Sequence, residues 1–305
     1  MGLGHVMRTL AVAQEAAANG HDVSYVMHDD PVACQLPERR GFKVTRLPDA
    51  DDRSWLTDVQ PGDRVVFDGY PFLANGITGD ARQRGATVAA VDDHDGGDVE
   101  ADVVVNPNAV DPARYVRATA ALCGPGYALV RSEFLPYRRQ RGEHARTLVV
   151  TLGGSDAGGL TEPLLGALDT HRPFEHVVLV AGPAAPEPPA RPRLEVVRDP
   201  SDVAATFDRA DAAISAAGST TWELLCLGVP SVLIEVAPNQ RLVALTAARH
   251  GAAFVAATIA DVVRAVDDLT DVRTRSTVSG RALATVDGLG ARRVVHTMFA
   301  PIEPL

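Results

Sequence analysis

The sequence predicts an α/β protein with two domains, each built on a parallel β-sheet. Along the 305 residues, short apolar runs that favour strands alternate with amphipathic runs that favour helices, a pattern typical of βα units. The order of strand, glycine loop and helix restarts after a polar, basic stretch at 136–146, which we interpret as a solvated interdomain linker. A chain of this length can form two domains of ordinary size. We therefore predict domains at residues 1–138 and 147–305.

The local pattern predicts where the strands and helices of both domains lie. Glycine, proline, asparagine and aspartate residues mark their ends. The predicted strands cover 23–27, 64–67, 87–91, 103–105, 147–152, 176–180, 211–215 and 231–235, and the predicted helices cover 10–18, 160–168, 220–227 and 239–250. Open parallel sheets bind ligands in the loops at the carboxyl ends of their strands. Polar residues at these ends are therefore the candidate functional residues.

The composition excludes several kinds of partner. The net charge is −10 and the isoelectric point about 5.3, which argues against nucleic acid and anionic membranes because phosphate groups bind basic surfaces. No apolar run reaches membrane-spanning length, and the first residues show no signal-peptide pattern. Cys34, Cys123 and Cys226 are far apart and form no Cys-x-x-Cys pair, which favours reduced thiols over disulfides or a zinc site. We expect a cytoplasmic protein that needs no metal ion and no cofactor.

The chain begins with a glycine turn that runs into an apolar-periodic helix. Gly4 belongs to this turn, and His5 stands at the start of the helix. The free N–H groups and the dipole of a helix start favour a bound phosphate, and a neutral imidazole there can act as a base. A glycine loop of this kind normally follows a buried strand. We therefore expect either that the first strand is absent or that the true start of the protein lies upstream.

Polar residues also follow three predicted strands of the first domain. The segments are Asp68-Gly69-Tyr70, Asp92-Asp93-His94 and Asn106-Pro107-Asn108. Each has an alternative explanation as turn chemistry, because aspartate, asparagine and glycine are common in turns. Their shared position at strand carboxyl ends favours a ligand site instead.

In the second domain, the first candidate loop is Gly153-Gly154-Ser155-Asp156. Its glycines allow backbone N–H groups to approach a ligand closely, and Ser155 adds a hydroxyl donor. The alternative is a tight turn from strand to helix in which Asp156 caps the helix.

The second candidate loop follows the predicted strand that ends at Ser215. Gly218 turns the chain, and Ser219 and Thr220 open a helix whose start suits a diphosphate. The small residues keep the backbone accessible to a ligand.

Three further polar residues of this region have two interpretations each. Glu223 forms a capping box with Thr220, or it accepts hydrogen bonds from ribose hydroxyls. Asn239 caps the next helix, or Asn239 and Gln240 orient a sugar through their amides.

Taken in order, these segments resemble a known family. The matching segments are Gly2-x-Gly4-His5-x-x-Arg8, Asp68-x-Tyr70, Asp92-Asp93, Asn106-x-Asn108-Ala109, the stretch from Cys123 to Phe134, Gly153 to Asp156, Ile214-Ser215-Ala216, Glu223 and Asn239-Gln240. The chain resembles the UDP-sugar hydrolases of pseudaminic acid biosynthesis and the spore-coat polysaccharide proteins grouped with them. These proteins are similar in fold to glycosyltransferases of the GT-B type, which implies two Rossmann-like domains. In the family a strand precedes the first glycine loop, and this chain lacks it.

The resemblance implies a function and a set of site residues. It implies inverting hydrolysis of a UDP-linked diacetamido-trideoxy sugar to UDP and free sugar, with His5 as the base that activates water and Tyr70 beside that water. A glycosyltransferase of the same fold and a non-catalytic nucleotide-sugar binder remain as alternatives, and the oligomeric state is not assigned. The predicted substrate-binding residues are Gly4, Arg8, Asp68, Asp92, Asn106, Gly153, Gly154, Ser155, Ser215, Gly218, Ser219, Thr220, Glu223, Asn239 and Gln240.

Overall fold

The computed structural model divides the chain into two compact units. Unit 1 comprises Met1–Ser132 and Leu289–Leu305, and unit 2 comprises Glu133–Gly288. The structure describes residues 3–49, 51–154, 156, 158–171, 173–182 and 185–302. This division differs from the predicted ranges at the end of the chain, because the last helix belongs to unit 1.

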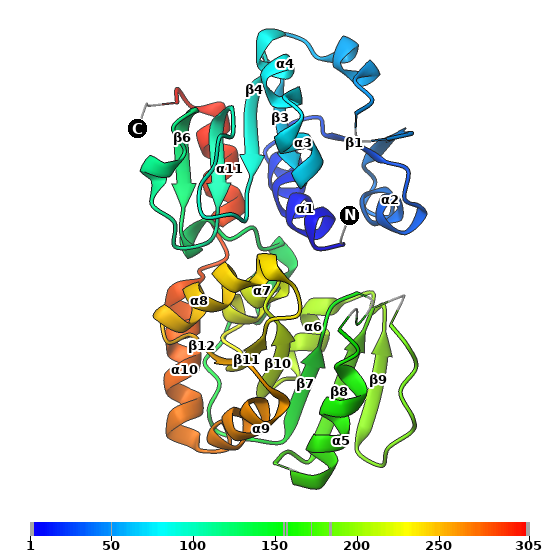
Figure 1. Cartoon of the computed structure of the whole chain (residues 1–305), viewed down its shortest axis with the longest axis vertical. Helices are drawn as coiled ribbons and strands as arrows, with labels where there is room; N and C mark the ends of the chain where they lie inside the picture. Colours follow the sequence, from blue (N-terminus) through cyan, green and yellow to red (C-terminus); the bar gives the residue numbers. More distant parts are fainter. Residues whose placement is uncertain are drawn as a thin grey trace. The chain divides into compact units, whose positions relative to one another are not determined.

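Unit 2 is built on one parallel sheet of six strands in the order β12-β11-β10-β7-β8-β9 (Figure 1). The strands are β7 (Thr147–Thr151), β8 (His176–Ala181), β9 (Leu194–Arg198), β10 (Ala212–Ala216), β11 (Ser231–Ile234) and β12 (Ala253–Ala256). Counted along the chain, the spatial order is 3-2-1-4-5-6, the order of dinucleotide-binding Rossmann sheets. The chain reverses direction across the sheet between β7 and β10, and ligands of such sheets bind at that point.

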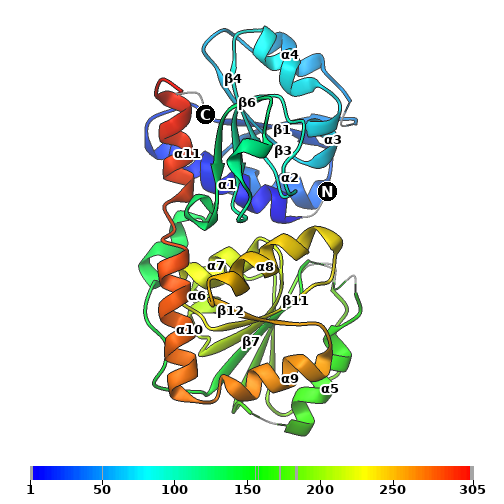
Figure 2. The same cartoon turned by 60° about the vertical axis from the view of Figure 1, so that its left-hand side comes forward.

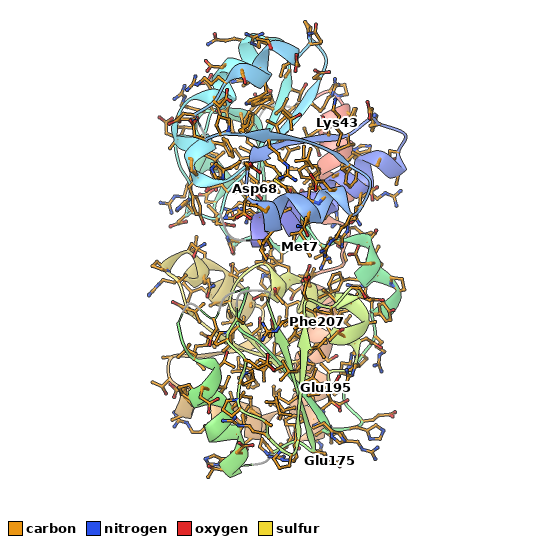
Figure 3. The ribbon with its side chains drawn as sticks, turned by 90° about the vertical axis from the view of Figure 1, so that its right-hand side faces the viewer. Met7, Lys43, Asp68, Glu175, Glu195 and Phe207 are labelled. Carbon is orange, nitrogen blue, oxygen red and sulfur yellow. The ribbon has the colours of Figure 1, made fainter. Side chains whose placement is uncertain are left out.

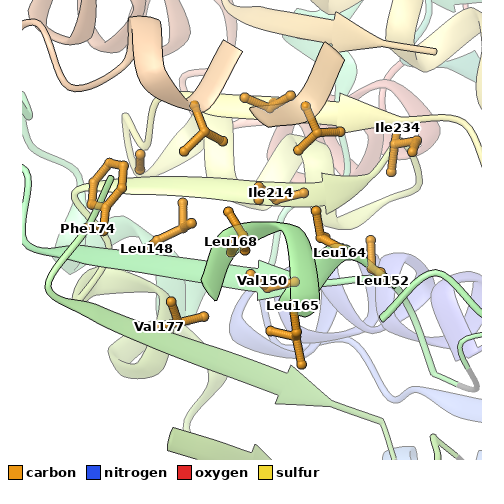
Figure 4. Packing of buried hydrophobic residues seen from close by; sticks show 14 of the residues in the cluster. Leu148, Val150, Leu152, Leu164, Leu165, Leu168, Phe174, Val177, Ile214 and Ile234 are labelled. Carbon is orange, nitrogen blue, oxygen red and sulfur yellow. The ribbon is translucent and has the colours of Figure 1, made fainter. Parts of the chain in front are cut away.

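Helices cover both faces of this sheet, because α5 packs on α9 and α7 packs on α10 (Figure 2). The helices of unit 2 are α5 (Thr161–His171), α6 (Val203–Asp208), α7 (Thr220–Cys226), α8 (Arg241–Arg249), α9 (Ile259–Asp268) and α10 (Val272–Thr285), with the short helices η4 (Ser132–Tyr137) and η5 (Pro238–Gln240). Strands buried on both faces need apolar residues at nearly every position. Leu148 and Val150 of β7 accordingly pack with Ile214 of β10 beneath Leu164 and Leu168 of α5 (Figure 4).

Unit 1 contains two separate sets of parallel strands. A four-stranded sheet has the order β3-β4-β5-β6, and β1 pairs with β2 alone. The strands are β1 (Ser24–His28), β2 (Lys43–Leu47), β3 (Arg64–Asp68), β4 (Thr87–Val91), β5 (Ala101–Asn106) and β6 (Ala118–Cys123). The helices are α1 (Leu3–Ala18), α2 (Pro31–Glu38), α3 (Tyr70–Ala74), α4 (Ile77–Gln83) and α11 (Gly290–Phe299), with the short helices η1 (Ser54–Asp58), η2 (Pro112–Arg114) and η3 (Pro125–Tyr127).

A cavity of about 770 Å³ lies between the two sets of strands, and we call it the β1–β3 slot. Its lining includes 23–27 at β1, 64–68 at β3 and the α1 residues Val6 and Val12. In the described part of the chain, no strand stands between β1 and β3. In unit 2 the corresponding place lies between β8 and β10, the second and fourth strands of that unit along the chain. The strand β7 occupies it. The β1–β3 slot therefore lies where β7 stands in the sheet of unit 2.

The last helix, α11, packs on α1 and on the sheet of unit 1 (Figure 2). Val294, Val295 and Met298 form one apolar face and share a buried cluster with Val12 of α1. At the helix start, a Cβ on Gly290 would lie 2.2 Å from the carbonyl oxygen of Ala128, so only glycine fits there. These contacts explain why the end of the predicted domain 147–305 returns to unit 1.

The basic stretch at 136–146 is not the solvated linker that its polarity predicts. Arg141 is buried in unit 2, where its guanidinium donates to the carbonyl oxygens of Asp208 and Ala210 and to the Asp208 carboxylate. Arg138 donates to the carbonyl oxygens of Cys226 and Val286. The arginines satisfy carbonyl groups at the ends of helices and strands, a role that charge alone does not reveal.

Candidate functional site

The candidate site of unit 1 centres on the buried carboxylate of Asp68, the last residue of β3. Arg8 donates from Nε to Oδ2 and from Nη2 to Oδ1, each at 2.6 Å, and Nδ1 of His5 lies 2.7 Å from Oδ1. His5 and Arg8 stand three residues apart on α1 and so share one helix face. Figure 3 marks Asp68 near α1, the helix that carries Met7. The predicted residues His5, Arg8 and Asp68 are thus brought together from 60 or more residues apart in sequence.

The charges of Asp68 and Arg8 bear on how His5 is oriented. Burial alone would raise the pKa of Asp68, but the charge of Arg8 and the hydrogen bonds from Arg8 and His5 outweigh it and lower the pKa. Burial disfavours the charge of Arg8 too, yet Asp68 and Asp93 raise its pKa overall, so the pair is ionised. An ionised carboxylate only accepts, so the contact with Asp68 is a hydrogen bond when Nδ1 of His5 carries the proton; Nη2 of Arg8 also lies 3.1 Å from this nitrogen. With the proton on Nδ1, the lone pair is on Nε2, the atom that can take a proton from a nucleophile.

Tyr70, the first residue of α3, lies beside His5. The two rings meet edge to face with their centroids 5.5 Å apart. The Tyr70 hydroxyl donates to Asp93 at 3.3 Å, and Nη1 of Arg8 donates to the other oxygen of Asp93 at 2.5 Å. The structure thus brings together the two residues predicted as catalytic. Asp93 completes this group, although our predicted site included only its neighbour Asp92.

Asp92 and Asn106 form a buried support for the loop after β4. Asp92 accepts from the backbone N–H groups of Asp93 and His94, from Nδ1 of His94 and from the hydroxyl of Tyr115. Asn106 donates to the same Tyr115 hydroxyl and to the carbonyl oxygen of His94. Both predicted residues are bonded within the protein. No sequence signal pointed to Tyr115, because it lies outside the strand ends.

Gly4 is the one predicted residue of unit 1 whose local structure differs from the prediction. α1 begins at Leu3, so Gly4 belongs to the first turn of the helix and not to a preceding glycine turn. Its N–H group is still one of those at a helix start that have no partner within the helix.

In unit 2, the glycine loop after β7 lies at the reversal point of the sheet. Gly153 has φ +93°, which strongly favours glycine, and a Cβ on Gly182 would lie 2.3 Å from Gly154. Asp156 accepts from the N–H groups of Leu160 and Thr161, so the capping interpretation of this residue is confirmed. The predicted residue Ser155 lies outside the described residues.

The loop after β10 forms the other side of the reversal point. Ser215 is buried and its hydroxyl donates to the carbonyl oxygen of Ala216. Ser219 precedes α7 and Thr220 begins it, but the Ser219 side chain makes no capping bond. The third helical position after Ser219 is Trp222, so the predicted capping box of Thr220 with Glu223 is wrong. The buried hydroxyl of Thr221 has no hydrogen-bond partner among the described residues.

Asn239 and Gln240 lie in η5, at the loop that follows β11. Asn239 does not cap the next helix, because α8 begins at Arg241 and Gln240 holds the capping position. Oε1 of Gln240 accepts from the N–H of Val236, while its Nε2 would lie 3.8 Å from a Cβ on Gly218. The Gln240 side chain thus lies close to the turn at Gly218.

Within the described ranges, no three His, Cys, Asp or Glu side chains are grouped as a metal ion would require. None of the described helices combines the length and the apolar character that crossing a membrane would need.

Comparison by sequence finds two relatives that share part of the chain. The spore coat polysaccharide biosynthesis protein SpsG of Bacillus subtilis is 30% identical over 142 residues, which are 43% of this chain and 42% of that protein. A protein of Methanocaldococcus jannaschii is 24% identical over 258 residues, which are 77% of this chain and 53% of that protein. The chain thus spans about half the length of the curated relatives it matches. No protein-family model matches it.

Comparison by structure covers the whole chain. MurG of Acinetobacter baumannii superposes with a TM-score of 0.68 at 20% identity, over 97% of this chain and 96% of that one. The protein LpCGTa, solved in complex with UDP, superposes with a TM-score of 0.66 at 12% identity, over 99% of this chain and 98% of that one. The calicheamicin glycosyltransferase CalG4 superposes with a TM-score of 0.60 at 17% identity, over 99% of this chain and 97% of that one. The chain therefore has the GT-B glycosyltransferase-like fold, as the resemblance in sequence predicts.

Proposed function

We propose that this protein is an inverting, nucleotide-sugar-dependent glycosyltransferase in which His5 activates the acceptor. The observation that carries the proposal is the contact of His5 Nδ1 with buried Asp68, which Arg8 keeps ionised. This is the arrangement by which a carboxylate orients a histidine base in unrelated enzymes. The glycosyltransferases among the structural neighbours support the transferase reading over other chemistries of the fold.

The proposed reaction is a single displacement at the anomeric carbon. Nε2 of His5 removes the proton of an acceptor hydroxyl, and the oxygen attacks the anomeric carbon from the side opposite the diphosphate. The bond between this carbon and the phosphate oxygen breaks, and the nucleoside diphosphate leaves with the bonding electrons. Asp68 stabilises the imidazolium that forms, and Tyr70 lines the position of the attacking oxygen.

The nucleotide belongs, in this proposal, to the reversal point of the unit 2 sheet. Gly153 and Gly154 allow backbone N–H groups to approach a diphosphate, and the loop from Gly218 to Thr220 lies on the other side of that point. Glu223, one turn into the helix that follows this loop, accepts hydrogen bonds from the ribose in this proposal. UDP is the proposed nucleotide, with Asn239 and Gln240 near the sugar or phosphate.

Hydrolysis of a UDP-linked amino sugar is the second candidate function. The similarity to SpsG favours it, because the motifs of this chain resemble the hydrolases with which spore-coat proteins are grouped. Water then replaces the acceptor hydroxyl, and His5 serves the same role. A nucleotide-sugar binder without turnover is the remaining alternative.

The deciding experiment incubates the protein with a panel of UDP-sugars and follows UDP and sugar by NMR, with and without candidate acceptors. Release of UDP that depends on an acceptor supports transfer. Release of free sugar without an acceptor would show that the reaction is hydrolysis and not transfer. Binding without any turnover of the panel would refute both catalytic readings.

A further inference from the structure

Unit 1 contains a second pair of imidazole and buried carboxylate, one strand along from the first. Nδ1 of His94 lies 2.9 Å from Oδ1 of Asp92, immediately after β4. The Asp92 side chain is 2% exposed, whereas the His94 side chain is 59% exposed. A buried carboxylate therefore holds an exposed imidazole here, whereas the imidazole that Asp68 holds, that of His5, is only 14% exposed.

Several hydrogen bonds hold the Asp92 carboxylate that contacts His94. Asp92 accepts from two backbone N–H groups, which an aspartate closing a turn would also do. It accepts in addition from the Tyr115 hydroxyl at 2.7 Å, and Asn106 braces that hydroxyl at 2.7 Å. A turn does not need this buried support. When Nδ1 of His94 donates its proton in a hydrogen bond to Asp92, the lone pair of the imidazole is on Nε2, which can accept a hydrogen bond.

His94 and His5 belong to the same end of the same sheet. β3 and β4 are adjacent parallel strands, with Asp68 opposite Val91. The ring of Tyr70 contacts both imidazoles, with its centroid 5.5 Å from that of His5 and 5.0 Å from that of His94. The His94 ring thus lies one aromatic ring away from the proposed base.

We propose that His94 is a substrate-contacting residue that recognises the sugar of the nucleotide sugar. Its Nε2 accepts a hydrogen bond from a donor group on the sugar, a hydroxyl or the N–H of an acylamino substituent. Asp92 and Tyr115 are positioning residues that act through His94. This inference rests on the proposed function, because it concerns the substrate of that same site.

The test compares the affinity for UDP with the affinity for the UDP-sugar that binds the wild-type protein most tightly, both by calorimetry. His94→Ala should weaken binding of the UDP-sugar about tenfold and leave binding of UDP unchanged. In turnover, KM should rise while kcat changes little, unlike a variant of the base. His28→Ala, at an exposed histidine that ends β1, is the matched control.

A second pair of variants separates positioning from folding. Tyr115→Phe keeps the ring but releases His94, and should raise KM in the same direction by a smaller factor. Asp95→Asn, an exposed neighbour paired with Arg114, should change nothing. Equal UDP-sugar affinity in wild type and a folded His94→Ala overturns the inference alone. A wild type that neither binds nor turns over any UDP-sugar of the panel overturns the inference together with the proposed function.

Discussion

The two units have related sheets, but only unit 2 has a continuous one. There β7 stands at the centre, paired with β8 on one edge and β10 on the other. In unit 1, β1 and β3 each pair on one edge only in the described chain, and the β1–β3 slot lies between them. Unit 1 instead joins its helix α1 to the sheet through side chains, since Arg8 reaches both Asp68 and Asp93. The β1–β3 slot thus lies where unit 2 has backbone pairing, and a charged network contacts α1 at the end of β3.

The strand ends of the two units differ in the same way. In unit 1 they carry ionised and aromatic side chains, which are suited to moving a proton. In unit 2 they carry glycines and small residues, which let the backbone approach a ligand. The difference assigns the proposed chemistry to unit 1 and the proposed nucleotide binding to unit 2, and each prediction below tests one side of it.

The largest expected effect is on catalysis in unit 1. His5→Asn removes the proton acceptor but keeps a polar side chain, so turnover should fall by about 10²–10⁴-fold. UDP affinity should stay close to that of wild type, because it depends on unit 2. Steady-state rates and calorimetry measure the two quantities, with His28→Asn as the control. A near-normal kcat would show that His5 only begins a helix.

Removing one charge of the buried network should cost stability. Asp68→Asn leaves Arg8 buried without its main counter-charge, which typically costs about 3–5 kcal/mol of unfolding free energy. Asp95→Asn breaks only an exposed pair with Arg114 and should cost less than about 1 kcal/mol. Urea unfolding of both variants measures the difference. Equal midpoints would show that the network does not hold α1 on the sheet.

The same carboxylate predicts a pH dependence. The pKa of Asp68 is lower in the folded protein than the ordinary value, so its contribution to stability is complete above about pH 4. It is lost as the pH falls through the folded pKa. As the pH is lowered from about 5, the unfolding free energy of the wild type should therefore fall more than that of Asp68→Asn. Urea unfolding of both proteins at a series of pH values measures the difference. Parallel losses would mean that Asp68 is not ionised in the folded state.

The sequence predicts the site of unit 1 better than its surroundings. His5 and Asp68 are 63 positions apart, yet the helix start that marked His5, the strand end that marked Asp68 and the family resemblance together placed both in one predicted site. Strand 87–91 was also predicted with the observed bounds. The sequence did not predict the strands β2, β6, β9 and β12. All four are edge strands in the described sheets, and edge strands have a weaker apolar pattern. Lys43–Leu47, for example, is mostly polar because one edge of β2 has no neighbour, so its periodicity is weak.

The contacts that the sequence could not predict depend on parts of the chain that are far apart. The apolar face of α11 is visible as a pattern, but nothing local indicates that Val294 packs near Val12 in the other half of the chain. The Tyr115 hydroxyl likewise joins Asp92 across 23 positions without any motif. The sequence around Glu223 matches a capping box in which Thr220 is the N-cap. In the structure the helix begins at Thr220 itself, one residue earlier than that motif requires.

A smaller effect is expected at the nucleotide site of unit 2. Glu223→Ala should weaken UDP binding by about 10–150-fold, since a hydrogen bond from a charged carboxylate contributes roughly 1.5–3 kcal/mol. The midpoint of unfolding should change less, because losing a residue near a helix start typically costs only about 0.5–2 kcal/mol. Asp268→Ala, at the exposed end of α9, is the matched control for both measurements. Unchanged UDP affinity with a lowered melting temperature would make Glu223 a structural residue.

The smallest expected effect concerns the β1–β3 slot. A version of the chain lengthened by about 10–20 residues ahead of residue 1, with one apolar strand of about five residues, can fill the slot. Such a strand would pair with β1 and β3 in parallel and cover the apolar lining, as β7 does in unit 2. A gain of about 1–2 kcal/mol would raise the melting temperature by roughly 2–8 °C for a unit of this size. An extension of the same length with prolines at alternate strand positions cannot donate the ladder hydrogen bonds and should give no gain. Equal melting temperatures for the two extensions would show that unit 1 is stable with its sheet divided, and that the network around Asp68 suffices to hold α1 in place.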